Sequence, residues 1–242
     1  MAKGYEPRDY RYLVPDGDWR QQTVICNETD IQVYATRDLV EGVNQAIHQA
    51  RGIIGAHIKQ EPEFATSLEP VANNVKAHDL VAWMKEASHK AGVGPMASVA
   101  SAINQYVADL IHDPELMLEN GGDLYIRSRA HRKVLIHAGS SPLSEQLALL
   151  VPPAPEGIGV CTSSGTVGHS LSFGQADAAI VISKDPLLAD ACATALGNRV
   201  KEEGDIDQAL EWVSGLRDIE GALVILGEKI GLIGDVHLVA AS

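Results

Sequence analysis

Residues 178–200 read AAIVISKDPLLADACATALGNRV, in which an apolar run is followed closely by the start of a helix. The run over residues 178–182 is apolar and partly β-branched, which is typical of a β-strand. Asp185 and Pro186 have the form of a helix N-cap followed by proline at the first helical position. The stretch therefore predicts a strand and then a helix over residues 186–200.

The rest of the second half contains many short apolar runs and one further helical stretch, at residues 205–216. Predicted strands cover residues 124–126, 134–136, 147–151, 159–161, 223–226 and 236–239. Strands grouped in this way, rather than alternating regularly with helices, indicate antiparallel or mixed sheets flanked by helices. The fold class predicted from the sequence is α+β.

The first half is mainly helical after a short β-rich start. Strands are predicted at residues 23–26 and 31–35. The intervening Asn27-Glu28-Thr29-Asp30 has hairpin character. Helices are predicted at residues 39–58, 79–87 and 96–111. Asp79 is the expected N-cap of the second of these helices, and residues 59–76 are expected to form a loop or a short strand.

Residues 1–20 are polar and charged and are expected to form an N-terminal arm. Residues 21–242 are expected to form the α+β domain, either as one body or as two lobes with the site between them. The start has no apolar run, so no signal peptide is expected, and no stretch of 18 apolar residues follows. The cysteines have no C-x-x-C spacing and are expected to be reduced and mostly buried, as in a cytoplasmic protein: Cys26, Cys161 and Cys192.

The formal net charge of −13 excludes several classes of partner. A strong acidic excess repels nucleic-acid phosphates and anionic lipid, so neither a nucleic acid nor a membrane surface is an expected partner. A small anionic ligand remains compatible with the composition if a local positive element binds it, such as a metal ion or a helix N-terminus.

Four segments carry residues that suit small-molecule chemistry. Glu119-Asn120-Gly121-Gly122-Asp123 combines two glycines, whose N–H groups can face a ligand, with side chains that hydrogen-bond hydroxyls or amides. The same residues also make ordinary turns. Gly92-Val93-Gly94-Pro95 opens the helix at residues 96–111, where free N–H groups can face an anion, and it is equally a plain helix–helix turn.

The segment CTSSGTVGHS at residues 161–170 contains five hydroxyls, two glycines and His169. Such donors suit phosphate or ribose oxygens, although a solvated polar loop has the same composition. The segment lacks the Gly-Lys-Ser/Thr of a P-loop and the Gly-x-Ser-x-Gly of a nucleophile elbow. On the following helix, Asp190 and Thr194 lie one turn apart and would suit a hard cation such as Mg²⁺, unless Asp190 is simply a surface residue.

The order of these segments resembles the ApbE family, which has a T-fold-related α+β architecture. The resemblance covers roughly residues 20–200, and Ala-Asp-Ala-x-Ala-Thr-Ala-Leu at residues 189–196 is its most specific match. Members of that family are Mg²⁺-dependent transferases that take FAD, attach FMN to a Thr or Ser of an acceptor protein, and release AMP. The resemblance therefore implies Mg²⁺ and FAD, or a related nucleotide, as the ligands of this chain.

Site residues can be carried over position by position from the resemblance. It implies that Asp190 and Thr194 ligate the metal through side chains, and Ala97 through its backbone carbonyl. His169 and Asp123 are the candidates for acid–base catalysis. The residues expected to contact the nucleotide are Asn120, Gly121, Gly122, Asp123, Thr162, Ser163, Ser164 and Gly165.

The chain also departs from the family pattern. Ser98 and Val99 stand where the family has Lys and Gly, and the Asp-Pro-x-Thr-Gly run that usually follows the family's His is absent. A cytoplasmic, shortened branch of the superfamily is thus implied. Three functions are compatible with it: a flavin-nucleotide transferase or pyrophosphate-cleaving enzyme, a non-catalytic flavin or nucleotide binder, and a protein that uses the fold for an unrelated small molecule. A homodimer is the expected assembly on base rates.

Overall fold

The computed structural model describes residues 19–72, 76–165 and 173–241 of the chain. Its centre is an eight-stranded sheet with the strand order β1-β2-β3-β4-β7-β8-β9-β10. The strands of this sheet are β1 (Arg20–Cys26), β2 (Thr29–Ala35), β3 (Leu116–Asn120), β4 (Asp123–Ser128), β7 (Ala154–Ser163), β8 (Ala178–Ser183), β9 (Ile219–Leu226) and β10 (Lys229–Gly234). A second, three-stranded sheet consists of β5 (Arg132–Leu135), β6 (Leu147–Val151) and β11 (Leu238–Ala240).

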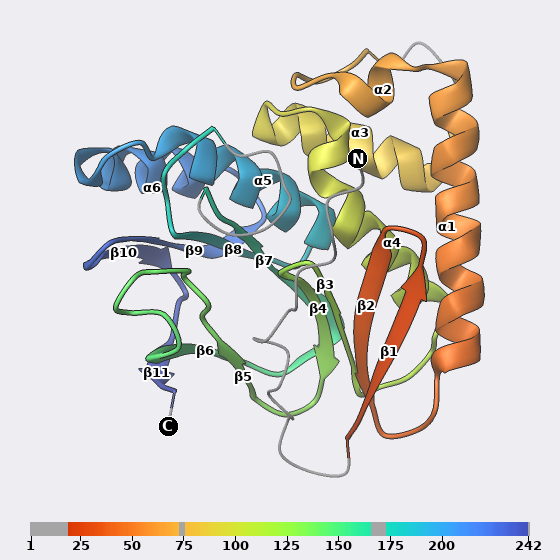
Figure 1. Cartoon of the computed structure of the whole chain (residues 1–242), viewed down its shortest axis with the longest axis horizontal. Coiled ribbons are helices and arrows are strands. Elements are labelled where there is room, and N and C mark those ends of the chain that lie inside the picture. Colours follow the sequence, from red (N-terminus) through yellow and green to blue (C-terminus); the bar gives the residue numbers. More distant parts are fainter. Residues whose placement is uncertain (1–18, 73–75, 166–172, 242) are drawn as a thin grey trace.

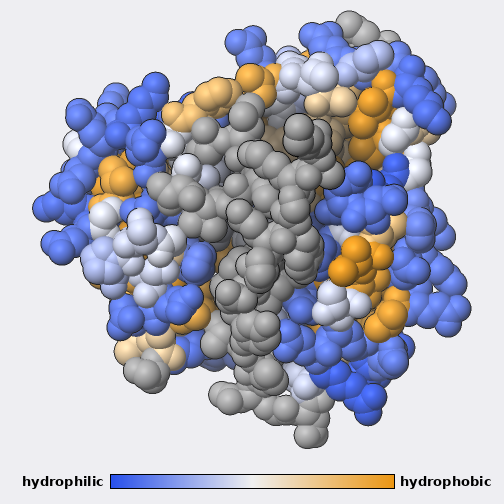
Figure 2. Space-filling model, in the orientation of Figure 1, coloured by the Kyte–Doolittle hydropathy of each residue, from blue (hydrophilic) through white to orange (hydrophobic). Residues whose placement is uncertain are grey.

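Helices cover one face of the large sheet, and the small sheet lies on the opposite side (Figure 1). The helices are α1 (Val40–Gln60), α2 (Glu63–Thr66), α3 (Asp79–Ala91), α4 (Val99–Leu110), α5 (Pro186–Arg199) and α6 (Ile206–Ser214), with two 3-10 turns, η2 (Pro95–Ser98) and η3 (Glu203–Asp205). The layers enclose two apolar clusters, one between the helices and the large sheet and one between the two sheets. On the face in Figure 2, the surface on both flanks is mostly hydrophilic, with apolar side chains in separate small patches.

The predicted α+β class is confirmed. Every strand pairing within the described residues is antiparallel, so the prediction of antiparallel or mixed sheets resolves to antiparallel pairing. The predicted hairpin is also present: β1 and β2 pair in register, and Asn27 takes the left-handed conformation, with φ 54°, in the turn between them. Among the described residues, no helix has the length and apolar character needed to cross a bilayer.

Several local predictions were wrong. The N-cap of α3 is His78, whose Nδ1 accepts a hydrogen bond from the Leu80 N–H, so Asp79 is already the first helical residue. The segment predicted as a loop at residues 59–76 contains the end of α1 and the short helix α2. Strands β3 and β10 were not predicted, and β1 begins at Arg20, inside the expected arm. The expectation of two lobes stays a prediction.

Helix α5 is the most buried helix of the fold and begins as predicted. Asp185 Oδ1 accepts hydrogen bonds from the N–H groups of Leu187 and Leu188, at 3.1 Å each, and Pro186 follows it. The helix α5 contacts the sheet, other helices and η2, so it is buried on nearly all sides. It therefore lacks the polar face that a surface helix turns to solvent. Polar residues on this helix therefore need partners inside the protein. All three cysteines are free and buried, as expected.

Gly94, just before η2, is required by a close backbone approach. A Cβ at this position would lie 1.9 Å from the Ser67 carbonyl oxygen, so alanine would push two backbone segments apart. We expect Gly94→Ala to destabilise the protein by about 2 kcal/mol. Urea unfolding should be compared with Gly204→Ala, where a Cβ meets nothing within 4 Å. Equal stability of the two variants would show that residues 67–68 do not hold η2 in place.

Candidate functional site

The start of α4 and the middle of α5 meet at Asp190. Oδ2 of this buried carboxylate accepts a hydrogen bond of 3.1 Å from the backbone N–H of Ser101, in the first turn of α4. N–H groups in a first helical turn have no intrahelical acceptor, and they carry the positive end of the helix dipole. Asp190 is therefore a buried acceptor at a helix N-terminus, which excludes the simpler alternative of a surface residue.

A short chain of polar contacts leads from Asp190 to Asp123. Ser101 Oγ lies 3.2 Å from the sulfur of Cys161, and Cys161 is the register partner of Asp123 across β4 and β7. The tertiary structure thus brings the predicted metal-binding residue and a predicted catalytic residue into one buried cluster. The sequence places them 67 positions apart, from position 123 to position 190.

Burial makes negative charge costly in this cluster. It raises the pKa of Asp190 to about 7, against which the Ser101 hydrogen bonds act in the opposite direction. Burial, followed by the negative charges of Asp190 and Glu119, raises the pKa of Asp123 well above its ordinary value. Burial, followed by the negative charges of Asp123 and Asp190, raises the pKa of Cys161, so this thiol is held in its protonated form. A cation at the cluster would offset the cost of ionising these carboxylates.

The predicted Asn-Gly-Gly-Asp turn joins β3 to β4 beside this cluster. Gly121 and Gly122 have φ values of 71° and 101°, which side chains rarely allow, and the Gly122 N–H donates to Glu119 Oε1 at 2.8 Å. The side chain of Asn120 donates to the carbonyl of Ala100 at 3.2 Å, which fastens the turn to α4. Glycines are thus needed here for backbone conformation as well as for any ligand.

The hydroxyl segment after β7 is only partly described. Thr162 lies next to the β3–β4 turn, since a Cβ on Gly122 would be 3.6 Å from its carbonyl oxygen. Ser163 lies against α5, where a Cβ on Gly197 would be 3.3 Å from the Ser163 hydroxyl. Ser164 and Gly165 follow the end of β7 at Ser163, and the Gly165 N–H donates to the Ala176 carbonyl at 2.9 Å. His169 lies outside the described residues, so its catalytic role stays a prediction.

The oxygen donors expected for a metal come from two neighbouring elements. Thr194 is half-buried on α5, one helical turn beyond Asp190, and Ala97 is half-buried in η2, which packs against α5. Ala97 precedes Ser101 by four residues, which is about one helical turn. Its carbonyl therefore lies near the Ser101 N–H group that donates to Asp190. Within residues 19–72, 76–165 and 173–241, no group of three or more His, Cys, Asp or Glu side chains is arranged to hold a metal ion. Any metal here therefore needs the hydroxyl and carbonyl donors.

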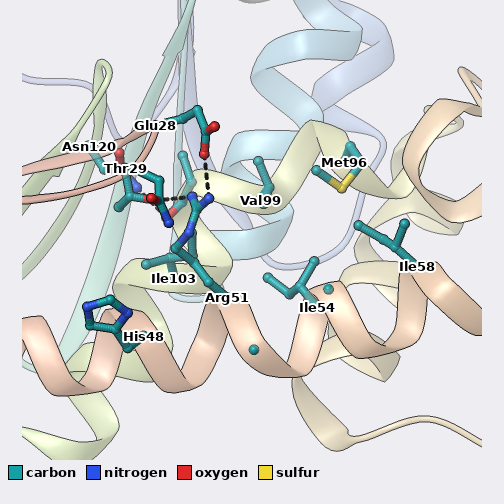
Figure 3. Close-up of a pocket in the computed structure, with 14 residues that line it drawn as sticks. Glu28, Thr29, His48, Arg51, Ile54, Ile58, Met96, Val99, Ile103 and Asn120 are labelled. Atoms are coloured by element: carbon teal, nitrogen blue, oxygen red, sulfur yellow. Dashed lines mark hydrogen bonds and ion pairs between the residues drawn. The ribbon is translucent and has the colours of Figure 1, made fainter.

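A cavity of about 670 Å³ borders this region and was missed by the sequence reasoning. It is lined by α1, by η2 and α4, by the β1–β2 turn and by Asn120. Figure 3 shows Ile54 and Ile58 of α1 facing Met96 and Val99 across the cavity, while Arg51 reaches toward Glu28. A sequence signal did exist, because Gly52 and Gly55 interrupt an otherwise strong helical pattern on one face of α1.

Comparison with known proteins shows the family of the chain. The family model described as "AbpE bacteria" matches residues 11–231, which is most of the chain. The chain belongs to the AbpE bacteria family. Membership covers every described residue of the candidate site, from the β1–β2 turn to α5.

The chain is also similar to individual relatives and to solved structures. A UPF0280 protein of Methanocella arvoryzae is 40% identical over 210 residues, covering 86% of this chain and 85% of its own. A UPF0280 protein of Methanocaldococcus jannaschii is 34% identical over 224 residues, covering 90% and 92%. The apo form of the flavinyl transferase ApbE of Pseudomonas stutzeri has a TM-score of 0.48 at 14% identity, covering 91% and 95%. The ApbE protein of Thermotoga maritima has a TM-score of 0.49 at 12% identity, covering 88% and 96%.

Proposed function

We propose that the protein is a Mg²⁺-dependent enzyme that binds FAD or a related flavin nucleotide and either transfers its FMN part or cleaves its pyrophosphate. The observation that carries the proposal is the position of Asp190. It is a buried carboxylate at the N-terminus of α4, in a chain that is similar to the flavin transferases ApbE of Pseudomonas stutzeri and Vibrio cholerae. Because the chain carries a net charge of −13, a diphosphate would have to be attracted by a bound cation or a helix N-terminus.

The residues around Asp190 fit a hard cation. Carboxylate, hydroxyl and carbonyl oxygens are the ligands that Mg²⁺ prefers, and Asp190, Thr194 and Ala97 supply one of each. The raised pKa of Asp190 supports the fit, because it reflects a buried negative charge that its neighbours compensate only partly. When bound, Mg²⁺ would neutralise the diphosphate and stabilise negative charge that develops on its oxygens.

The remaining site residues would bind and orient the nucleotide. Thr162 adds a hydroxyl donor next to the β3–β4 turn, and Ser163 adds one against α5. Acid–base catalysis by His169 or Asp123 remains part of the proposal. The raised pKa of Asp123 shifts this carboxyl toward its protonated form, which suits a proton donor better than a base. An acceptor protein would be the partner if FMN is transferred.

One observation favours a second candidate, a flavin or nucleotide binder without turnover. Ser98 occupies the position of the family's lysine, and its buried hydroxyl donates to the Pro95 carbonyl at 3.0 Å instead of facing a ligand. A serine in this position cannot supply the positive charge of a lysine to a phosphate. Binding of FAD without release of products would therefore select this candidate.

The test is incubation of the purified protein with FAD and Mg²⁺, with and without EDTA, followed by chromatography of FMN and AMP. We expect either product to appear only with Mg²⁺, and Asp190→Asn to reduce its rate by at least about 100-fold, as for loss of a charge-stabilising group. Gln208→Asn, on the exposed side of α6, is the matched surface control. The proposal fails if Asp190→Asn leaves both turnover and Mg²⁺-dependent FAD binding unchanged.

A further inference from the structure

The cavity between α1 and α4 has the size and shape of a ligand compartment. Its volume of about 670 Å³ lies in the range of small-molecule sites. The α1 side contributes residues spaced three and four apart, so one face of that helix forms its floor: His48, Arg51, Gly52, Ile54, Gly55 and Ile58. The α4 side contributes Met96, Val99, Ala100 and Ile103 in the same helical spacing.

Two glycines in the floor are the decisive feature. Gly52 and Gly55 lie inside the 21-residue helix α1, where glycine is less favourable than alanine. No crowding explains them, because a Cβ at either position would meet nothing within 4 Å. Both face the cavity, so their lack of a side chain leaves open space there and exposes helix backbone to a flat group.

The opposite wall is apolar and completes a slot. Met96 and Val99 lie across the cavity from Ile54 and Ile58 (Figure 3), and Ile103 also lines it. Aliphatic side chains on one side and bare helix backbone on the other suit the two faces of a planar ring. The aliphatic side chains and the two glycines offer a phosphate no side-chain donors, so the charged part of a ligand has to lie elsewhere.

The polar end of the slot carries little net charge. Arg51 donates to Glu28, in an ion pair, and to the Thr29 hydroxyl at 2.8 Å. Arg51 is thus compensated, and Glu28 and Thr29 are fixed by it. Hydrogen-bonding side chains with compensated charge at this end suit the edge of an uncharged ring better than an anion.

The slot is connected to Asp190 through neighbouring residues of α4. Asn120 and Ala100 both line the cavity, and they are joined by a hydrogen bond of 3.2 Å. Ser101, the next residue after Ala100, donates to Asp190. A nucleotide with its phosphates at Asp190 would therefore have a ring within reach of the slot.

We infer that Gly52 and Gly55 are specificity-determining residues, whose missing side chains admit a flat, uncharged heterocyclic ring of the nucleotide between α1 and α4. The inference rests on the proposed function, because the ring belongs to the nucleotide whose phosphates lie at Asp190. Alanine at these two positions should weaken nucleotide binding and raise the stability of the protein. Alanine favours the helix, whereas its methyl group occupies the space of the ring.

The experiment measures binding of FAD, FMN and AMP by titration calorimetry, and the melting temperature of the ligand-free protein, for Gly52→Ala, Gly55→Ala and the double variant. We expect the double variant to bind FAD at least about 10-fold more weakly while its Tm rises by about 2–4 °C. FMN and AMP each contain one of the two rings of FAD. The compound that loses affinity for the variants together with FAD shows which ring occupies the slot. Gly42→Ala is the control in the same helix, since its Cβ lies outside the cavity and meets only the end of the Ile111 side chain.

The outcomes separate this inference from the proposed function. If Asp190→Asn abolishes Mg²⁺-dependent FAD binding while the glycine variants bind like the wild type, the ring lies elsewhere and the inference is overturned. If the glycine variants lose affinity for FMN or AMP while Asp190→Asn changes nothing, the slot stands and the metal-based function falls. Absence of binding of all three compounds to the wild type would overturn both.

Discussion

Asp190→Asn is expected to stabilise the metal-free protein at pH 8 by roughly 3 kcal/mol, although the same change is expected to remove the proposed Mg²⁺ site. The reason is the energetic cost of a buried charge. Burial raises the pKa of Asp190 to about 7, whereas an aspartate in the unfolded chain ionises near pH 4. Asparagine keeps a carbonyl oxygen that can accept from the Ser101 N–H, without a charge to bury.

The sign of the pH dependence follows from proton binding. Between about pH 4 and pH 7 the folded protein retains the Asp190 proton while the unfolded chain has released it, so folding takes up a proton. The contribution of Asp190 to stability is therefore fully present below about pH 4. It declines as the pH rises and is lost once the pH passes about 7.

Urea unfolding in EDTA at pH 5 and at pH 8 measures this effect. The difference in unfolding free energy between Asp190→Asn and the wild type should grow in favour of the variant from pH 5 to pH 8. Comparing variant with wild type at each pH cancels the titration of the other groups. A variant that is less stable than the wild type at pH 8 would show that the ionised carboxylate is needed to cap α4, and would refute the prediction.

Lys85→Met is the second change with a large expected effect, a loss of about 3 kcal/mol. Lys85 is 1% exposed, and its ammonium lies 2.6 Å from Glu61 Oε2 and 3.2 Å from the Ala72 carbonyl. Burial opposes ionisation of Glu61, but hydrogen bonds from Lys85 and His57 outweigh it and lower the pKa of Glu61. Methionine would leave the Glu61 charge, which is only 15% exposed, without its main partner.

Two further variants test the cause of that loss. Lys90→Met, in the same helix, removes an exposed i,i+4 partner of Glu86 and should cost less than about 1 kcal/mol. The double variant Lys85→Met/Glu61→Gln should recover most of the stability lost by Lys85→Met, because both charges are then removed together. Without that recovery, the loss would have to come from the contacts of the lysine stem rather than from the ion pair.

The comparison of predicted and observed elements shows where local signals are reliable. The N-terminal hairpin, α1, α4 and α5 were predicted because each has its own turn residues, caps or helical spacing. Strand β10 contains two glycines and has no clear alternation, and it forms only because it pairs with β9. His78 was missed as an N-cap because histidine is not among the usual capping residues.

Some features of the candidate site could likewise be predicted from local sequence, and others depended on tertiary packing. Asp190 and Thr194 were identifiable because four residues of helix place them on one face, whatever surrounds the helix. That Asp190 is buried depends on α4, whose Ser101 N–H comes from 89 positions away. The cavity was out of reach of sequence reasoning, since it lies between α1 and α4 and is closed by the β1–β2 turn.

Residue types and short-range spacing were enough to establish the α+β class, the acidic surface and the oxygen-rich segments of this protein. They act through local backbone preferences, which need no partner. The environment of those segments was decided by packing alone. The charge state of Asp190, its link to Asp123 through Ser101 and Cys161, and the open slot above Gly52 and Gly55 all arise between elements distant in sequence. Desolvation and charge–charge coupling depend on which atoms become neighbours, and only the folded chain determines that.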